Sequence, residues 1–312
     1  MNENHIFDLY SGEGKTLLDR NLSLPPFRTM DVLESNDSYI ASPRLRDAVN
    51  VSLALGQPLL LTGEPGTGKT RLAYSIAHEL GLDRPLVFHT KTTSNAKDLF
   101  YRYDSLAHFH DAQLREKGNL NITDYITYEA LGTAIRDSQN KRHVVLIDEI
   151  DKAPRDLPND VLNEFEEMAF TVQETGESFE ANLPNRPILI LTSNSEKNLP
   201  DAFLRRVVYY HIPFPDKATL ERIITARLVL SDDFKNNMLK AAIQHFVEIR
   251  QAKGLRKPPA TAELLSWIHI LHQHKITLNG STREELEKLA MSYSILAKNK
   301  EDLEKLKNLA RP

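Results

Sequence analysis

The sequence predicts an α/β protein in which a parallel β-sheet lies between helices, followed by an all-helical region. Two observations predict this. Short, nearly continuous apolar runs, as at residues 58–61 and 143–147, alternate with longer segments whose apolar residues recur three and four apart. After residue 215 the apolar runs stop and only the helical spacing continues. We therefore expect a leader at residues 1–41, an α/β domain at residues 42–214 and a helical domain at residues 215–312.

The individual elements follow from the same patterns. Ser42 and Pro43 predict the start of the first helix, because serine caps helices and proline is tolerated at the first helical position. Apolar runs predict strands at residues 58–61, 86–89, 143–147, 188–191 and 207–212. Helical spacing predicts helices at residues 71–80, 123–138 and 159–169, and then at 217–230, 234–250, 261–273, 283–298 and from 301. Residues 90–118 are predicted to be an insertion between strands, and residues 170–181 a β-hairpin.

Composition narrows the class of protein. The 312 residues are 41% hydrophobic and 26% charged, as in ordinary globular proteins. No apolar run approaches the roughly 20 residues that span a bilayer, and the N-terminus lacks a signal-peptide pattern, so we expect a soluble, cytoplasmic protein without a membrane partner. The absence of cysteine excludes disulfides and thiolate sites. A net charge of −4 gives no general attraction for nucleic acid, so we do not expect a nucleic-acid partner.

The segment Gly63–Thr70, GEPGTGKT, has the pattern of a phosphate-binding loop between a strand and a helix. Its glycines allow backbone N–H groups to face a polyphosphate, and the helix that follows presents its positive end to the same anion. A lysine in this position reaches the outer phosphates, while the threonine hydroxyl can ligate Mg²⁺. The residues predicted to bind a nucleoside triphosphate are Gly63, Glu64, Pro65, Gly66, Thr67, Gly68, Lys69, Thr70 and Arg71.

Two carboxylates end the third predicted strand. Asp148 and Glu149 follow a buried apolar run, where a negative charge is costly unless a nearby cation compensates it. A Mg²⁺–nucleotide supplies that cation, so Asp148 is predicted to hold the metal together with Thr70. Glu149 is then placed to polarise the water that attacks the γ-phosphate. The alternative is that both carboxylates merely cap the next element.

Three other groups of residues suggest sites less strongly. Thr192, Ser193 and Asn194 end the fourth predicted strand and offer neutral hydrogen-bonding side chains near the expected nucleotide. Arg205 and Arg206 follow a short predicted helical turn and are expected to be exposed. The histidines at positions 89, 108 and 110 invite a metal-site interpretation, but no carboxylate pattern accompanies them and histidines two apart lie on different sides of a helix. We do not expect a metal site there.

In this order, the motifs GEPGTGKT, VVLIDEID and LTSN and the helical second domain resemble those of AAA+ ATPases. The long segment after the second strand, the hairpin before the fourth and LPDAFLRR resemble the MoxR branch, including the CbbQ and NorQ types. The resemblance implies a P-loop NTPase αβα sandwich with a five-stranded parallel sheet and a helical lid. It also implies ATP and Mg²⁺ as cofactors, a homo-oligomeric ring that is typically a hexamer, and a protein client, often with a von Willebrand factor A domain partner.

Residue by residue, the resemblance assigns roles to the motifs. Lys69 and Thr70 match the phosphate-loop lysine and the Mg²⁺ ligand, and Asp148 and Glu149 match the second acidic motif. Asn194 matches the first sensor, which helps to position the attacking water. Arg206, or its neighbour Arg205, falls where relatives have an arginine finger that acts on the nucleotide of the adjacent subunit.

The sequence departs from the family at one position. Relatives commonly have a second-sensor arginine at the start of the third lid helix, where this chain has Ala262, and Arg256 or Lys257 are the nearby substitutes. The function expected from the resemblance is a Mg-dependent ATPase that remodels or matures a partner protein. The alternatives are a nucleic-acid motor or restriction subunit, which the acidic hairpin tip disfavours, and a nucleotide-gated scaffold with little turnover. A small-molecule kinase is disfavoured by the combination of acidic, sensor and finger motifs.

Overall fold

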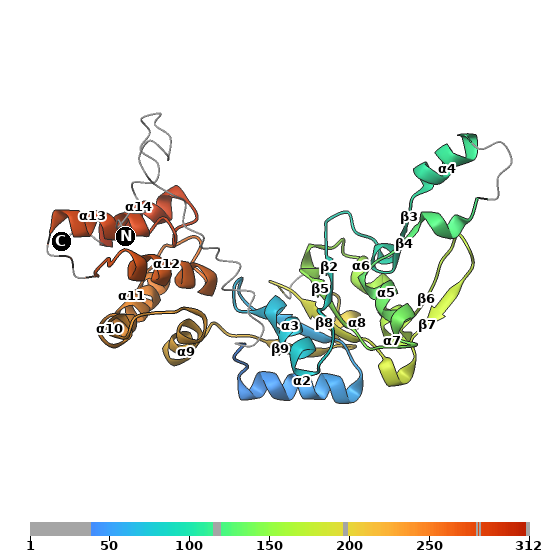
Figure 1. Ribbon diagram of the computed structural model, residues 1–312, viewed down its shortest axis with the longest axis horizontal. Helices are drawn as coiled ribbons and strands as arrows, with labels where there is room; N and C mark the ends of the chain where they lie inside the picture. The colour runs from blue at the N-terminus through green and yellow to red at the C-terminus, as the bar shows by residue number, and fades with distance from the viewer. Residues whose placement is uncertain (1–38, 115–119, 196–198, 279, 281, 310–312) are drawn as a thin grey trace. The chain divides into compact units, whose positions relative to one another are not determined.

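A computed structural model describes residues 39–114, 120–195, 199–278, 280 and 282–309, so most of the expected leader lies outside the described residues. The described chain divides after Phe214 into two compact units, which are considered separately (Figure 1). The sheet unit spans Tyr39–Phe214, and the helical unit contains the described residues from Pro215 onward. Within the described ranges, no helix is both long enough and apolar enough to cross a membrane.

The sheet unit is built on five parallel strands, which confirms the predicted fold class. They lie in the order β2-β5-β8-β1-β9. Every residue of β1 and β8 is buried, because helices cover both faces of the sheet and leave no solvent side for polar residues. The five strands are β1 (Leu59–Thr62), β2 (Leu86–His89), β5 (Val144–Asp148), β8 (Ile188–Thr192) and β9 (Val208–His211).

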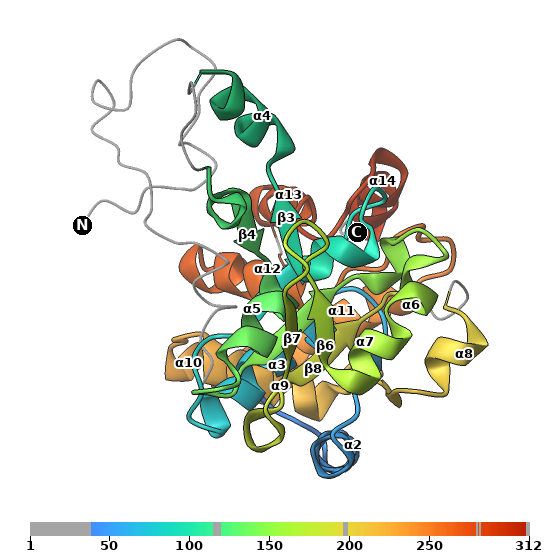
Figure 2. The same ribbon diagram turned by 90° about the vertical axis from the view of Figure 1, so that its right-hand side faces the viewer.

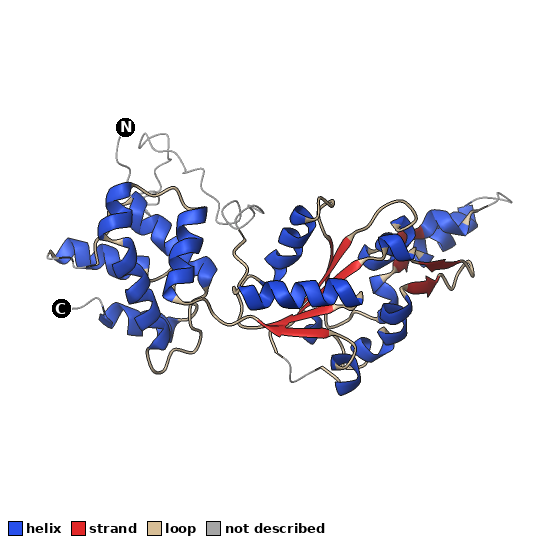
Figure 3. Ribbon diagram, turned by 90° about the horizontal axis from the view of Figure 1, so that it is seen from below, coloured by secondary structure: helices blue, strands red, loops and turns tan. Residues whose placement is uncertain are grey.

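Helices pack against both faces of this sheet (Figure 3). Alternate strand residues belong to different core clusters: Leu59 and Leu61 pack with α2 (Pro43–Leu55) and α3 (Lys69–Glu79). Leu60 packs on the opposite face. The helices that contribute to that second cluster are α5 (Ala130–Asp137), α6 (Leu157–Asp160), α7 (Leu162–Glu167) and α8 (Asp201–Leu204).

The helix predicted at residues 159–169 is two short helices, because Val161 leaves the helical conformation at φ −101° and ψ 6° while its side chain is fully buried. Three 3₁₀ turns complete the connections around the sheet: η3 (Ala96–Leu99), η5 (Ile150–Lys152) and η6 (Leu183–Asn185).

The predicted insertion contains more structure than the sequence indicated. An antiparallel pair of three-residue strands forms here, β3 (Tyr101–Tyr103) and β4 (Ile126–Tyr128), which we call the arm together with the described residues between them, 104–114 and 120–125. Those residues include α4 (Ser105–Leu114), which projects away from the sheet, and η4 (Ile122–Tyr125) (Figures 1 and 2). The helix predicted at residues 123–138 therefore begins only at α5.

The predicted hairpin is present as β6 (Ala169–Thr171) and β7 (Ser178–Glu180), and it packs against the base of the arm. Phe170 stacks on Phe100 with ring centroids 5.1 Å apart and on Phe179 at 5.2 Å. Tyr128 of β4 meets Phe179 edge-on at 5.7 Å. Aromatic contacts of this kind join the arm and the hairpin into one packed end of the unit.

The described residues of the helical unit form helices and the loops between them, without a β-strand. Trp267, Phe246 and Tyr293 are its large buried side chains, and Trp267 Nε1 donates to Ser292 Oγ over 2.9 Å. The helix predicted at residues 283–298 ends at Ser292. The apolar spacing continues beyond it because Tyr293 and Leu296 are buried in the turn that follows. The helices are α9 (Lys217–Arg227), α10 (Asp232–Asn237), α11 (Leu239–Gln251), α12 (Thr261–Gln273), α13 (Arg283–Ser292) and α14 (Lys300–Leu309).

The loop before α12 holds the candidate substitutes for the second sensor. Buried Asp302 accepts hydrogen bonds from the backbone N–H groups of Arg256 (3.0 Å) and Lys257 (3.1 Å). The Arg256 guanidinium lies 3.0 Å from Glu301, and the side chains of Arg256 and Lys257 are both exposed. Arg256 is thus engaged in an ion pair within the helical unit, and the Lys257 ammonium forms none with a described residue.

Candidate functional site

The phosphate-binding loop lies between β1 and α3, at the edge of the sheet where the parallel strands end. Gly63, Gly66 and Gly68 have φ values of 142°, 77° and 91°, which are strained for any residue with a side chain. A Cβ on Gly63 would also lie 2.5 Å from the carbonyl oxygen of Ile212. Gly68 caps α3 without a side-chain hydrogen bond, so the first N–H groups of α3 are open to an anion.

The Lys69 ammonium lies within this loop and donates to three acceptors. They are the carbonyls of Gly63 (2.8 Å) and Glu64 (3.0 Å) and Oδ1 of Asn194 (2.9 Å). Burial lowers the pKa of Lys69, although Asp148, Asp151 and Glu149 act in the opposite direction. An ammonium held by neutral oxygens at the start of a helix is suited to exchange them for phosphate oxygens.

The remaining loop residues have different environments. Thr67 is buried, and its hydroxyl donates to the Glu64 carbonyl over 2.9 Å, which closes the turn. Glu64, Pro65 and Gly66 are exposed at the tip. The Arg71 guanidinium lies 5.0 Å from the centre of the Tyr74 ring, a cation–π contact on α3. The loop therefore presents backbone groups and Lys69, rather than further charged side chains, to a bound phosphate.

Asp148 is the last residue of β5 and gathers hydroxyl groups from two neighbouring elements. Its Oδ1 accepts from Thr70 (2.9 Å) and from Thr192 at the end of β8 (2.6 Å). His89 of β2 lies 3.6 Å away from Oδ2. Hydroxyl and carboxylate oxygens are the ligands that Mg²⁺ prefers, so the donor set of Thr70 and Asp148 fits that ion beside a bound phosphate.

Glu149 directly follows β5 and has a left-handed backbone, with φ 58° and ψ 50°. This conformation costs a non-glycine residue about 1–2 kcal/mol. A hydrogen bond from its N–H to buried Thr192 Oγ1, at 2.9 Å, helps to hold it. Its carboxylate accepts two hydrogen bonds: Asn194 Nδ2 donates to Oε1 over 3.2 Å, and Lys152 Nζ donates to Oε2. Strain of this kind concentrates at functional sites.

Asn194 links the phosphate loop to the acidic pair. Its Oδ1 accepts from Lys69 and its Nδ2 donates to Glu149, so only one orientation of the amide satisfies both neighbours. Its N–H donates to Asp151 Oδ1 over 3.2 Å. A phosphate that drew Lys69 away would thus change the hydrogen bonding of the amide that holds Glu149.

The structure brings together Lys69, Thr70, Asp148, Glu149 and Asn194 at one edge of the sheet. It adds partners that the motifs did not assign. Thr192 connects Asp148 to the backbone of Glu149, Asp151 orients Asn194, and Lys152 pairs with Glu149. The short spacing from Glu149 to Lys152, one 3₁₀ turn, is the signal that could have identified that pair.

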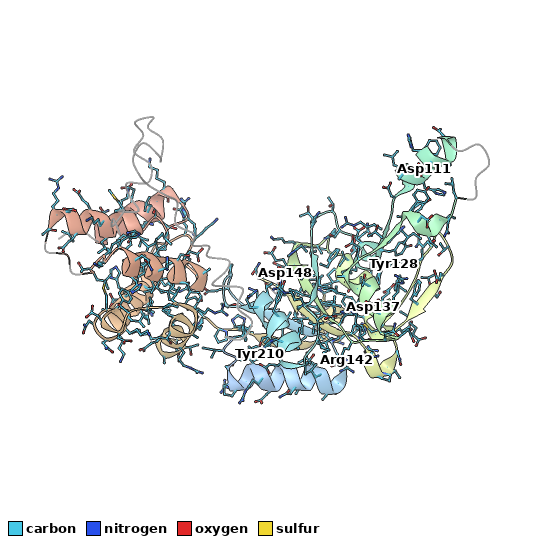
Figure 4. The ribbon with its side chains drawn as sticks, in the orientation of Figure 1. Asp111, Tyr128, Asp137, Arg142, Asp148 and Tyr210 are labelled. Atoms are coloured by element: carbon cyan, nitrogen blue, oxygen red, sulfur yellow. The ribbon has the colours of Figure 1, made fainter. Side chains whose placement is uncertain are left out.

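Arg205 and Arg206 lie at the opposite edge of the sheet, before the start of β9. Figure 4 labels the two edges, with Asp148 at the end of β5 and Arg142 just before its start. A cleft of about 260 Å³ at the amino-end edge is lined by both arginines, Glu166, Arg186 and the chain leading into β1. No single copy of the sheet unit therefore brings these arginines to its own phosphate loop.

The histidine interpretation can be examined in the same way. His108 of the arm hydrogen-bonds the Tyr103 hydroxyl and stacks on Tyr125 at 4.7 Å, which accounts for it structurally. His110 lies 3.6 Å from Asp111. Across the residues that the structure describes, no three His, Cys, Asp or Glu side chains gather closely enough to hold a metal ion.

Comparison with known proteins finds one family model, one relative and two solved structures that resemble this chain. Residues 58–207 match the family model of the AAA domain, dynein-related subfamily. The chain is 27% identical over 213 residues to the gas vesicle ATPase GvpN of Ancylobacter aquaticus, which covers 62% of this chain and 57% of that relative. The RuvB Holliday junction branch migration motor of Thermotoga maritima is 14% identical, with 89% and 73% of the two chains covered and a TM-score of 0.46. A variant of the same motor gives a TM-score of 0.44.

Proposed function

We propose that this chain, whose residues 58–207 form an AAA domain of the dynein-related subfamily, is a Mg²⁺-dependent ATPase of MoxR type. It assembles into a homo-oligomeric ring, typically a hexamer, and uses ATP hydrolysis to remodel or mature a partner protein. The observation that carries the proposal is the hydrogen-bonded series Lys69–Asn194–Glu149, with Asp148 and Thr70 beside it. It joins a phosphate-binding cation to a carboxylate that is placed to act on water.

The residues divide the work of hydrolysis. Lys69 and the N–H groups of the loop bind the outer phosphates, while Thr70 and Asp148 hold Mg²⁺. When bound, the ion screens the charge that develops on the transferring phosphoryl group. Glu149 orients the attacking water and accepts its proton. Asn194 fixes the carboxylate of Glu149 and relates its position to the phosphates through Lys69.

The arginines support assembly. Arg206 lies at the amino-end edge of the sheet, away from the phosphate loop at the carboxyl-end edge, so it can serve only a nucleotide bound by another copy. A head-to-tail contact between the two edges repeats from copy to copy and closes into a ring. Positive charge supplied in this way stabilises the transferring phosphoryl group.

The client is proposed to meet the arm and the hairpin. On α4, Leu106 is 78% exposed and Phe109 is 61% exposed. A protein with a von Willebrand factor A domain is the proposed partner. Because a relative is named a gas vesicle ATPase, gas vesicle components are among the clients to test. The hairpin tip carries Glu174 and Glu177, which disfavours a nucleic-acid client.

The direct experiment measures ATP and GTP hydrolysis against protein concentration, with mass determined by light scattering at the same concentrations. Turnover should appear as the ring forms. It should be lost in Glu149→Gln, which still binds ATP, and in Arg206→Ala. A monomer that hydrolyses ATP and is indifferent to Arg206→Ala would overturn the ring mechanism. A ring that binds ATP without turnover would instead support the nucleotide-gated scaffold.

A further inference from the structure

Arg206 is oriented by its own chain. Its Nε donates to Oε1 of Glu166, and its Nη1 donates to the Ala202 carbonyl over 3.3 Å. These contacts with the described residues use two of the five N–H bonds of the guanidinium group, which leaves one N–H of Nη1 and both N–H bonds of Nη2 for another acceptor. The neighbouring Arg205 side chain is exposed and makes no hydrogen bond or ion pair with any described residue. The two arginines therefore differ in how far their direction is fixed.

Glu166 is itself held in place. It lies in the last turn of α7, where Arg186 Nη2 donates to the carbonyls of Phe165 (3.2 Å) and Glu166 (2.9 Å). Phe165 anchors the same turn in the core of the sheet unit. On the other side, Phe203 of α8 is fully buried two residues before Arg205. The carboxylate and the arginine thus stand on two separately anchored elements.

We propose that Glu166 is a positioning residue for Arg206, which aims the outer nitrogens of the guanidinium at the nucleotide of a neighbouring copy. The inference rests on the proposed function, in which Arg206 acts in trans. A free arginine side chain loses rotamer entropy when it is fixed. Glu166 removes that cost before the neighbour's phosphate arrives, as preorganised groups do at other phosphoryl-transfer sites.

This role differs from that of an ordinary surface ion pair. Both side chains are about half exposed, at 40% for Arg206 and 52% for Glu166. Pairs of this kind contribute little to folding stability. Removal of the Glu166 carboxylate should therefore leave the fold and the affinity for ATP nearly unchanged while it lowers turnover.

The first test compares four variants of the full chain in its assembled form. Glu166→Ala should lower kcat roughly tenfold with KM for ATP unchanged, a smaller loss than the roughly 10³-fold expected for Arg206→Ala. Glu166→Gln keeps an acceptor oxygen at the same reach and should restore most of the activity. Glu167→Ala removes the adjacent exposed carboxylate of the same helix and should behave as wild type. Equal kcat for Glu166→Ala and Glu167→Ala would overturn the inference.

The second test assigns Glu166 to one side of the subunit interface. Glu166→Ala is mixed 1:1 with Glu149→Gln, which retains Glu166 and Arg206. The mixture should reach about a quarter of the wild-type activity, because one interface in four joins an intact Glu149 of one copy to an intact Glu166–Arg206 pair of its neighbour. In a mixture of Glu166→Ala with Arg206→Ala, the ATPase activity should not rise above that of Glu166→Ala diluted to the same extent. The reverse pattern would show that Glu166 acts on its own nucleotide site and would overturn the inference.

The same mixtures separate failure of this inference from failure of the proposed function. If Glu149→Gln and Arg206→Ala are each inactive but restore each other, the trans mechanism holds, and the Glu166 result then stands or falls alone. If Arg206→Ala alone hydrolyses ATP at the wild-type rate, the trans mechanism fails, and the role of Glu166 as its positioning residue fails with it.

Discussion

At the carboxyl-end edge of the sheet the functional side chains follow directly on the strands, whereas at the amino-end edge they come from separate connecting segments. Asp148 and Thr192 are the last residues of β5 and β8, and the phosphate loop follows β1. The backbones of Asp148 and Thr192 are fixed by the buried sheet. Each of these side chains is therefore positioned by the element that precedes it.

The amino-end edge is assembled differently. Glu166 comes from α7, Arg186 from the loop before β8 and Arg206 from the loop before β9. Their directions depend on one another, through Arg186 to the end of α7 and through Glu166 to Arg206. In the proposed function, the carboxyl-end edge binds and hydrolyses the nucleotide, and the amino-end edge presents a positive charge to a second copy.

The largest expected effect is at the phosphate loop. Lys69→Ala removes the ammonium that would contact the outer phosphates, and we expect affinity for ATP to fall by about 100-fold or more. Titration with a fluorescent ATP analogue measures it. Lys141→Ala, just before β5 at the amino-end edge, serves as the matched control and should bind as wild type. Equal losses in both variants would remove the functional distinction between the two edges.

The next effect is at Thr192, whose hydroxyl serves both carboxylate residues. Thr192→Val keeps the shape but leaves the Glu149 N–H and Asp148 Oδ1 without this partner. We expect turnover to fall roughly tenfold or more and the free energy of unfolding to fall by about 1–3 kcal/mol. Steady-state kinetics and urea unfolding measure the two quantities. Full turnover in this variant would mean that the backbone of Glu149 needs no support from β8.

The smallest effect sharpens the description of the amino-end edge. Arg186→Met removes the donor to the carbonyls of Phe165 and Glu166, and the free energy of unfolding should fall by about 1–3 kcal/mol. Nucleotide affinity should stay within about twofold of wild type, because Arg186 lies at the other edge. Exposed Arg84→Met is the control for loss of an arginine. A large loss of ATP affinity in Arg186→Met would contradict the independence of the two edges.

The sequence predicts the carboxyl-end edge well because each site residue there adjoins a run with a strong pattern. Leu59–Leu61 and Val144–Ile147 are continuous apolar runs, so the positions of Lys69, Asp148 and Asn194 relative to the sheet follow from strand ends. Glu166 shows the opposite case. Its partner Arg206 is 40 residues later in the chain, and no local pattern relates the two.

Two features of the fold escaped prediction for related reasons. Strands β3 and β4 have only three residues each, too few for an alternating pattern to stand out, and the packing of Tyr128 against Phe179 is a tertiary contact. Helical spacing at residues 234–250 continues across a break at Met238, with φ −128°, because Phe234 before the break and Leu239 after it are both buried. Burial sets the apolar spacing whether or not the helix is continuous.

The most direct measurement mixes two inactive variants, Glu149→Gln and Arg206→Ala, at a series of ratios and follows ATP hydrolysis. If the active site is divided between copies, the 1:1 mixture should recover about a quarter of the wild-type rate, since one interface in four joins an intact Glu149 to an intact Arg206. The recovery should be greatest near equal amounts. Mixtures that stay inactive at every ratio, although light scattering shows mixed assemblies, would contradict the division of the site between two copies.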